Sequence, residues 1–278
     1  MRGGQPRTYR WLSAHRRKKL MNLSSLIDLV DLSWLSLLLF CLAVLGAAIL
    51  RGFSGFGFAL AAVPLASLIV APTKAVAIAV LLQATVGVRD VIKGRSVLDW
   101  PGLKRLALGA LVGTPLGLFG LVYLDAALTR LAIAAIVVVG VLLLLPKAHP
   151  DAPVRLHLAA PTGILAGLFG GLAAMPGPPV VAYYLSGATP PKVIRATMMV
   201  FFFFTALLAL PGLALGGLLD GETLLLALIA IPLMLAGTTL GAAIFARAPK
   251  AAYRPVALVV LIVMALGSGL RGLLEVLG

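Results

Sequence analysis

Long apolar runs, separated by short polar or proline-containing stretches, fill most of this 278-residue chain. Most runs approach the ~20 residues that a helix needs to span the hydrocarbon core of a bilayer. Only 12% of the residues are charged, which is too few to cover the surface of a soluble domain of this size. The sequence therefore predicts an all-α membrane protein with about ten transmembrane segments. The expected segments are 32–50, 53–71, 75–92, 103–123, 128–146, 156–174, 176–189, 193–212, 222–246 and 253–274.

The net charge of +14 follows the borders of these segments. Seven of the 23 Lys and Arg residues lie in the first 19 residues, and most of the others lie between apolar runs. This distribution is typical of charge that flanks a membrane, and it argues against a nucleic-acid-binding face. The single cysteine, Cys41, excludes a disulfide within the chain.

The two halves of the chain resemble each other. A proline-rich polar stretch at 147–155 is the expected linker between a first repeat, 21–146, and a second repeat, 156–278. Residues 1–20 form a basic tail that we expect not to belong to the native fold, with Met21 as an alternative start. The matching positions are Gly52, Gly55 and Pro64 with Gly167, Gly170 and Pro179, and Gly113-Thr114-Pro115-Leu116-Gly117 with Gly237-Thr238-Thr239-Leu240-Gly241.

Five segments per half is an odd number, so the second repeat is expected to be inverted relative to the first. The basic loops support this, because Lys192, Arg195 and Arg247 fall on one side and Asp220 and Glu222 on the other. Basic loops favour the cytoplasm. The count then places the N-terminus outside, which conflicts with its basic residues unless Met21 is the start or one segment is re-entrant.

Two segments, 52–64 and 167–179, place several glycines and then prolines inside otherwise apolar sequence. Glycine weakens a helix and proline removes a backbone hydrogen bond. Within a bilayer such breaks are tolerated only where they face protein or a polar cavity. Paired breaks in corresponding positions indicate the binding site of a transporter. We therefore expect two broken helices that meet near the membrane midplane.

The chemistry-bearing residues favour anion binding over catalysis. All nine acidic residues are expected at or beyond segment ends, and no catalytic or metal-binding cluster is apparent, so no cofactor or metal is expected. Backbone N–H groups at helix N-termini bind anions without a charged side chain. The predicted substrate-binding residues are Arg51, Ser54, Gly55, Phe56, Gly57, Gln83, Gly170, Gly171, Pro176, Gly177, Pro178, Tyr183 and Arg195, with Tyr184 and Arg89 as further donors.

Simpler interpretations exist for several of these residues. Gly52–Gly57 are also typical of a close helix-packing face. Arg51, Arg89 and Arg195 are also typical of anchors whose charged ends reach the membrane interface. Residues 201–204, four consecutive phenylalanines, indicate apolar bulk and support no functional hypothesis.

The glycine and proline motifs, together with Pro191-Lys192 and the two G-T-x-L-G-like segments, resemble the TauE/SafE family over about residues 34–274. The resemblance implies export of a small sulfur-containing anion, such as sulfite, sulfoacetate or sulfolactate, across the bacterial inner membrane. It does not fix which anion is carried, and the motifs identify the family better than the substrate.

The sequence thus predicts an exporter that contacts the bilayer and a small anion, with association into a homodimer left open. Each negative charge that leaves an inside-negative cell gains about 2.3 kcal/mol per 100 mV, so efflux can proceed without a coupling ion. The alternatives are an importer of a similar anion, a metal-cation permease, which the lack of ligand clusters disfavours, and a multi-pass lipid-modifying enzyme.

Overall fold

The computed structural model describes residues 32–144 and 154–247, and within these ranges the chain is helical without strands. The tail, most of the linker and the tenth expected segment, 253–274, lie outside the described residues. The helices are α2 (Trp34–Ser54), α3 (Phe58–Ala66), α4 (Pro72–Gly94), α5 (Trp100–Tyr123), α6 (Ala126–Leu144), α7 (Ala159–Ala173), α8 (Gly177–Leu185), α9 (Pro191–Leu215) and α10 (Gly221–Arg247), with 3₁₀ turns η2 (Arg95–Val97) and η3 (Leu156–Leu158).

Six helical stretches in the described residues are long and apolar enough to cross a membrane. They contain α2, α4, α5, α7, α9 and α10, which confirms the expected helical membrane protein. The expected segments 53–71 and 176–189 are not among the six membrane-length helices. They contain the nine-residue helices α3 and α8, each about 14 Å long, or roughly half the thickness of the hydrocarbon core.

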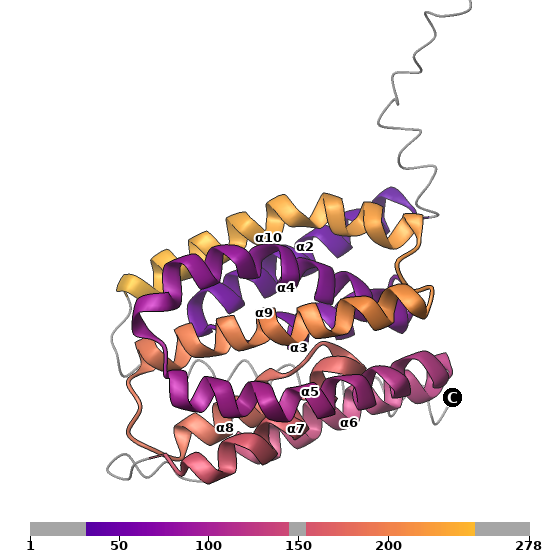
Figure 1. Ribbon diagram of the computed structural model, residues 1–278. Coiled ribbons are helices and arrows are strands. Elements are labelled where there is room, and N and C mark those ends of the chain that lie inside the picture. The colour runs from indigo at the N-terminus through magenta and orange to yellow at the C-terminus, as the bar shows by residue number, and fades with distance from the viewer. Residues whose placement is uncertain (1–31, 145–153, 248–278) are drawn as a thin grey trace, which may run out of the picture.

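The long helices run in two opposite directions (Figure 1). Helices α4 and α10 are parallel, because Lys74 contacts Glu222 at their first turns and Arg89 donates to Thr239 further along both. Helix α2 joins this set, since Ala48 lies beside Gly237 and Gly52 beside Gly241.

The opposite set consists of α5, α7 and α9. Glycines at 109, 113 and 117 in α5 lie against residues 160, 164 and 168 in α7, so the two helices advance together. Helix α9 is parallel to α5 and antiparallel to α4. It lies between α2, α4 and α10 on one side and α5 to α8 on the other (Figure 1).

Glycine, which has no side chain, allows the closest of these helix contacts. A Cβ at Gly113 would clash with the carbonyl oxygen of Ile164, and one at Gly241 with that of Ile49. Gly52 and Gly167 lie in the same two interfaces, where a Cβ would meet the backbone of α10 or α5. Small residues at such positions let two helix backbones approach closely. The packing interpretation therefore applies to Gly52 and Gly167.

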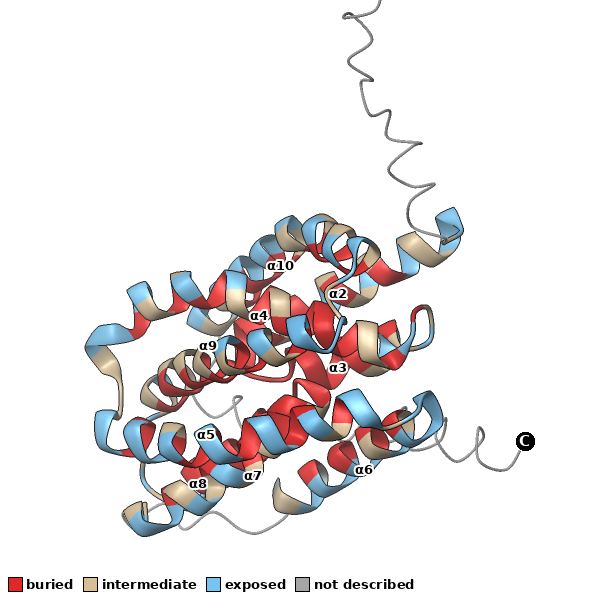
Figure 2. Ribbon diagram, turned by 45° about the vertical axis from the view of Figure 1, so that its right-hand side comes forward, coloured by how far each residue is buried: buried red, intermediate tan, exposed pale blue. Residues whose placement is uncertain are grey.

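The exposed residues lie on the outer faces of the helices, while the inner faces and most of α3 are buried (Figure 2). Many of the exposed residues are large and apolar. Such faces suit contact with lipid. Aromatic side chains lie exposed near helix ends, with Trp100 and Tyr123 at the two ends of α5 and Trp34 at the start of α2. Amphipathic aromatic rings are enriched at both membrane interfaces.

Candidate functional site between the two helix breaks

The first break separates α2 from α3 at residues 55–57. Gly55 and Gly57 adopt positive φ angles of 83° and 88°, which glycine tolerates better than any residue with a side chain. The Ser54 hydroxyl donates to the carbonyl oxygens of Leu50 and Phe56 at 2.8 and 2.6 Å, and the Phe56 N–H contacts it at 3.3 Å. Ser54 therefore lies within the turn and helps to hold its shape.

The second break separates α7 from α8 at residues 174–176. Ala174 has a φ of 58°, and no other non-glycine residue in the described ranges has a positive φ. Its N–H donates to the Gly170 carbonyl, and the next N–H, of Met175, donates to Phe169. Pro176 then precedes the first turn of α8.

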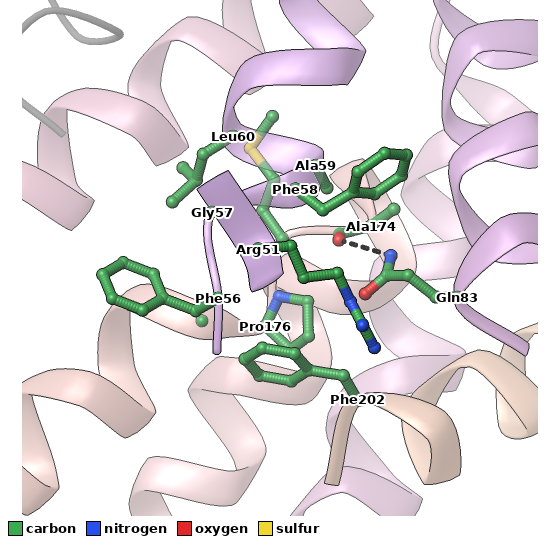
Figure 3. A pocket seen from close by; sticks show the side chains of 12 residues that line it. Arg51, Phe56, Gly57, Phe58, Ala59, Leu60, Gln83, Ala174, Pro176 and Phe202 are labelled. Carbon is green, nitrogen blue, oxygen red and sulfur yellow. Dashed lines mark hydrogen bonds between the residues drawn. The ribbon is translucent and has the colours of Figure 1, made fainter. Parts of the chain in front are cut away.

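The two breaks line one small pocket, although they lie more than a hundred residues apart in sequence (Figure 3). Gln83, at the middle of α4, lines it too and donates to the Ala174 carbonyl at 3.2 Å. The space open to the centre of a water molecule is about 10 Å³, or room for roughly one water. The lining residues are Arg51, Phe56, Gly57, Phe58, Ala59, Leu60, Gln83, Ala174, Met175, Pro176, Gly177 and Phe202.

A buried ion pair closes one side of this pocket. Arg51 is 1% exposed, and its Nη2 lies 2.5 Å from Oδ2 of Asp90, which is 9% exposed. The other two guanidinium nitrogens, Nε and Nη1, are buried and have no hydrogen-bond partner among the described residues. The guanidinium group lies between Gln83 and Phe202 (Figure 3). The site thus holds a cation with unused donors.

This pair corrects two expectations. Arg51 was expected at the mouth of a segment or as an interface anchor, but it is buried. Asp90 was expected at or beyond a segment end, but it lies inside a helix. Helix α2 continues to Ser54 and α4 to Gly94, so both groups lie at least three residues inside their helix ends.

The two helix N-termini at the pocket differ in what they can donate. The first N–H groups of a helix have no partner within it. Helix α3 therefore offers the N–H groups of Phe58, Ala59 and Leu60. Helix α8 offers that of Gly177, because Pro178 and Pro179 in its first turn carry no N–H. An anion in this pocket would receive most of its backbone hydrogen bonds from α3.

Of the predicted residues, Arg51, Phe56, Gly57, Gln83, Pro176 and Gly177 line the pocket. The others lie around it or elsewhere. Gly170 lies inside α7 beside Pro176, and Gly171 packs against the Thr114 backbone. Pro178 packs against Gly140, and Tyr183 contacts Tyr184 edge to face at 4.9 Å.

Arg195 is separate from the pocket. Its Nη2 donates to the Gly52 carbonyl at 2.6 Å, and its guanidinium lies 5.0 Å from the centre of the Phe245 ring. Tyr184 donates to Asp99, the N-cap of α5, at 3.0 Å. Neither Arg195 nor Tyr184 lines the pocket.

Sequence reasoning missed Asp90 and the lining residues Phe58, Ala59, Leu60, Ala174, Met175 and Phe202. Asp90 could have been found, because it falls inside the expected segment 75–92, where an ionisable residue is a functional candidate. Phe202 was one of four indistinguishable phenylalanines. Ala174 gave no signal, since alanine rarely adopts a positive φ. In the described ranges, no three His, Cys, Asp or Glu side chains group as metal ligands.

The family model described as "Sulfite exporter TauE/SafE" matches residues 39–268. The chain belongs to the TauE/SafE family. The "Probable sulfite/organosulfonate exporter TauE" of Cupriavidus necator is 29% identical over 209 residues, which cover 72% of this chain and 80% of that relative. No solved structure matches the chain. This TauE/SafE protein is therefore a multi-pass membrane transporter, and membership in a family of exporters agrees with the expectation that it is not an enzyme.

Proposed function

We propose that the protein exports a small sulfur-containing anion, sulfite or an organosulfonate such as sulfoacetate, from the cytoplasm across a bacterial inner membrane. The name of the Cupriavidus relative supports this substrate class, because 80% of that protein aligns with this chain. The pocket between the two helix breaks is the proposed binding site.

The observation that carries the proposal is the incomplete pairing of Arg51. A buried cation needs compensation for the water that it has lost. Asp90 binds one nitrogen, while Nε and Nη1 are unused. A planar guanidinium presents parallel donors that match the oxygens of an oxyanion. The N–H groups at the start of α3 would supply further donors.

The helix directions support two inverted repeats of five segments. In the expected alignment α2 corresponds to α7, α4 to α9 and α5 to α10. The members of each pair run in opposite directions, because α2, α4 and α10 form one parallel set and α5, α7 and α9 the other. Inverted repeats with interrupted helices are typical of secondary transporters, whose substrate site lies where the repeats meet.

Binding requires the pocket to widen, because about 10 Å³ is too little for a sulfite ion. The two short helices α3 and α8 border the pocket, so displacement of either would enlarge it. We therefore assign the structure to a closed state, and we expect transport to alternate between states that open to either side.

The experiment compares sulfite efflux from proteoliposomes and sulfite affinity for three proteins. Arg51→Gln alone leaves Asp90 buried without its partner, so this change also threatens folding. The double variant Arg51→Gln with Asp90→Asn removes both charges together. Arg95→Gln is the control, because Arg95 is exposed near the end of α4.

We expect the double variant to melt near the native temperature and to lose efflux and at least tenfold in affinity. The control should behave as the native protein does. A well-folded double variant with native sulfite affinity and efflux would show that Arg51 does not bind the substrate.

A further inference from the structure

A second and larger cavity lies beside the ion pair, between α4, α9 and α10. It lies at the end of the bundle where α4 ends and α9 begins. The space open to the centre of a water molecule is about 170 Å³. We call this cavity the vestibule. Its polar lining consists of Arg89, Asp90, Lys93, Lys192, Arg195 and Thr238.

The vestibule carries an excess of positive charge. Four of its lining side chains are cationic, and its one acid, Asp90, is already paired with Arg51 outside the vestibule lining. Lys93 and Lys192 are exposed, while Arg195 is half-buried and held over the Phe245 ring. A concave surface lined by one sign of charge raises the local concentration of counter-ions. The vestibule therefore attracts anions.

A buried hydroxyl adds a specific donor. Thr238 is 5% exposed and lines the vestibule, and its Oγ1 is buried without a hydrogen-bond partner among the described residues. A buried polar group without a partner is destabilising, so it usually has a ligand, a water or a functional reason. A bound anion would accept a hydrogen bond from this hydroxyl.

We propose that the vestibule is a second anion-binding site, at which the substrate waits before it enters the central pocket. The direction of loading rests on the proposed export function, whereas the site itself does not. Asp90 lines the vestibule, Arg51 lines the central pocket, and the two are bonded, so the ion pair forms the partition between the sites. An anion that binds the two unused nitrogens of Arg51 weakens its bond to Asp90 and opens this partition.

The four cations favour small oxyanions with two negative charges over those with one. An organosulfonate that also carries a carboxylate belongs to this class. Sulfoacetate and chloride are therefore the probes to compare, and the binding of both should weaken as salt is added, because exposed charges are screened.

The test uses two threonines that differ in location but match in chemistry. Thr238 and Thr114 occupy corresponding places in the two repeats, and both hydroxyls are buried without a partner in the described ranges. Thr114 does not line the vestibule. Valine has nearly the same shape as threonine, so Thr238→Val and Thr114→Val each remove only a hydroxyl.

Calorimetric titration of the purified full chain with sulfoacetate should show two sites in the native protein. Thr238→Val should weaken one of them about tenfold, because a hydrogen bond to a charged group is lost. Thr114→Val should leave both affinities unchanged. The pair Lys93→Gln with Lys192→Gln should weaken the same site as Thr238→Val and reduce its salt dependence, whereas Lys104→Gln, at an exposed lysine outside the vestibule, should not.

Two outcomes would overturn the vestibule site. One is a single class of site that neither Thr238→Val nor the lysine pair alters. The other is an equal effect of Thr238→Val and Thr114→Val. Thr238→Val separates this proposal from the proposed function, because it should weaken the vestibule site and leave the affinity of the central site unchanged. Native vestibule affinity in Thr238→Val contradicts this proposal alone, whereas native efflux in the Arg51→Gln, Asp90→Asn variant contradicts the proposed function alone.

Discussion

Arg51 and Asp90 are bonded to each other inside the helix bundle, in an interior with few other charges. A buried pair contributes little to stability as a whole, because the charges lose their water. Removing one member is more damaging, since the other charge is left uncompensated. Asp90 contacts only one guanidinium nitrogen of Arg51, so the other two stay available to an anion while the pair is intact.

We expect Asp90→Asn to lower the melting temperature, in line with the loss of about 3–5 kcal/mol seen when one partner of a buried pair is removed. Sulfite should restore part of this loss, because it supplies the missing negative charge. Differential scanning fluorimetry with and without sulfite measures both effects.

Asp125→Asn is the matched control, since Asp125 is exposed and caps α6, a role that asparagine fills equally well. If sulfite raises the melting temperature of Asp90→Asn no more than that of native protein, then Asp90 does not compete with the anion.

Gly57 allows a second comparison, between two glycines near the same helix. Gly57→Ala should cost about 1–2 kcal/mol, because alanine resists a φ of 88° and its Cβ would lie 3.1 Å from the Leu50 side chain. Gly46→Ala should stabilise by about 0.5–1 kcal/mol, because Gly46 is inside α2 with open space around it. Chemical denaturation measures the change in unfolding free energy for both variants. Equal changes would contradict the turn conformation assigned to Gly57.

Six residues named from the sequence line the central pocket, but the electrostatics of that pocket were not predicted. Gly57, Gln83 and Gly177 were found because glycine and amide groups are conspicuous in apolar segments. The partnership of Arg51 with Asp90 was not, because 39 residues separate them and their contact depends on how α2 packs beside α4. Ser54 was expected to bind substrate. Its hydrogen bonds within the turn were not predicted, because they depend on the backbone conformation of Gly55 and Phe56.

At the scale of helices, close glycine contacts set the spacing of α2 against α10. Gly241→Ala should destabilise the protein by about 1–3 kcal/mol, because the new Cβ would meet the Ile49 carbonyl and force the backbones apart. Gly221→Ala at the start of α10 meets nothing within 4 Å and serves as the control. The melting temperatures of Gly241→Ala and Gly221→Ala, measured by thermal unfolding in detergent, test this difference. A neutral Gly241→Ala would mean that the two helices are not in close contact.

The limits of the long helices followed from apolar runs and proline positions. Pro72 and Pro191 begin α4 and α9, three and two residues before the expected starts at 75 and 193, because proline is favoured in a first turn. The glycines and prolines predicted that both regions are interrupted, but not where the short helices α3 and α8 begin and end. Apolar sequence continues through both regions, and composition alone does not reveal which residues adopt the positive φ angles at the breaks.

Across the whole molecule, charge is divided between the two ends of the helix bundle. The vestibule end is basic, whereas at the opposite end Lys74 contacts both Asp220 and Glu222 and so links α4 to α10. Hydrogen bonds from Thr223 lower the pKa of Asp220 below its usual range, so that carboxylate stays charged at physiological pH. By the positive-inside rule, we expect the vestibule end to face the cytoplasm.

Cysteine labelling tests this orientation. In a Cys41→Ser background, cysteines at Arg95 and Lys192 should react with an impermeant reagent only from the cytoplasmic side, and cysteines at Asp125 and Asp220 only from outside. All four positions lie at helix ends in the described residues. Labelling of Arg95 and Lys192 from opposite sides would contradict the inverted arrangement.

The narrowness of the central pocket matters to the cell that makes this protein. A continuous water-filled pore would let protons and small ions flow down their gradients and discharge the membrane. Here the space between the helix breaks admits roughly one water, and a bonded pair of side chains lies across its border. We therefore expect the closed state assigned above to leak few ions across a membrane. Under the proposed export function, a cell could then keep many copies in its membrane without uncoupling respiration.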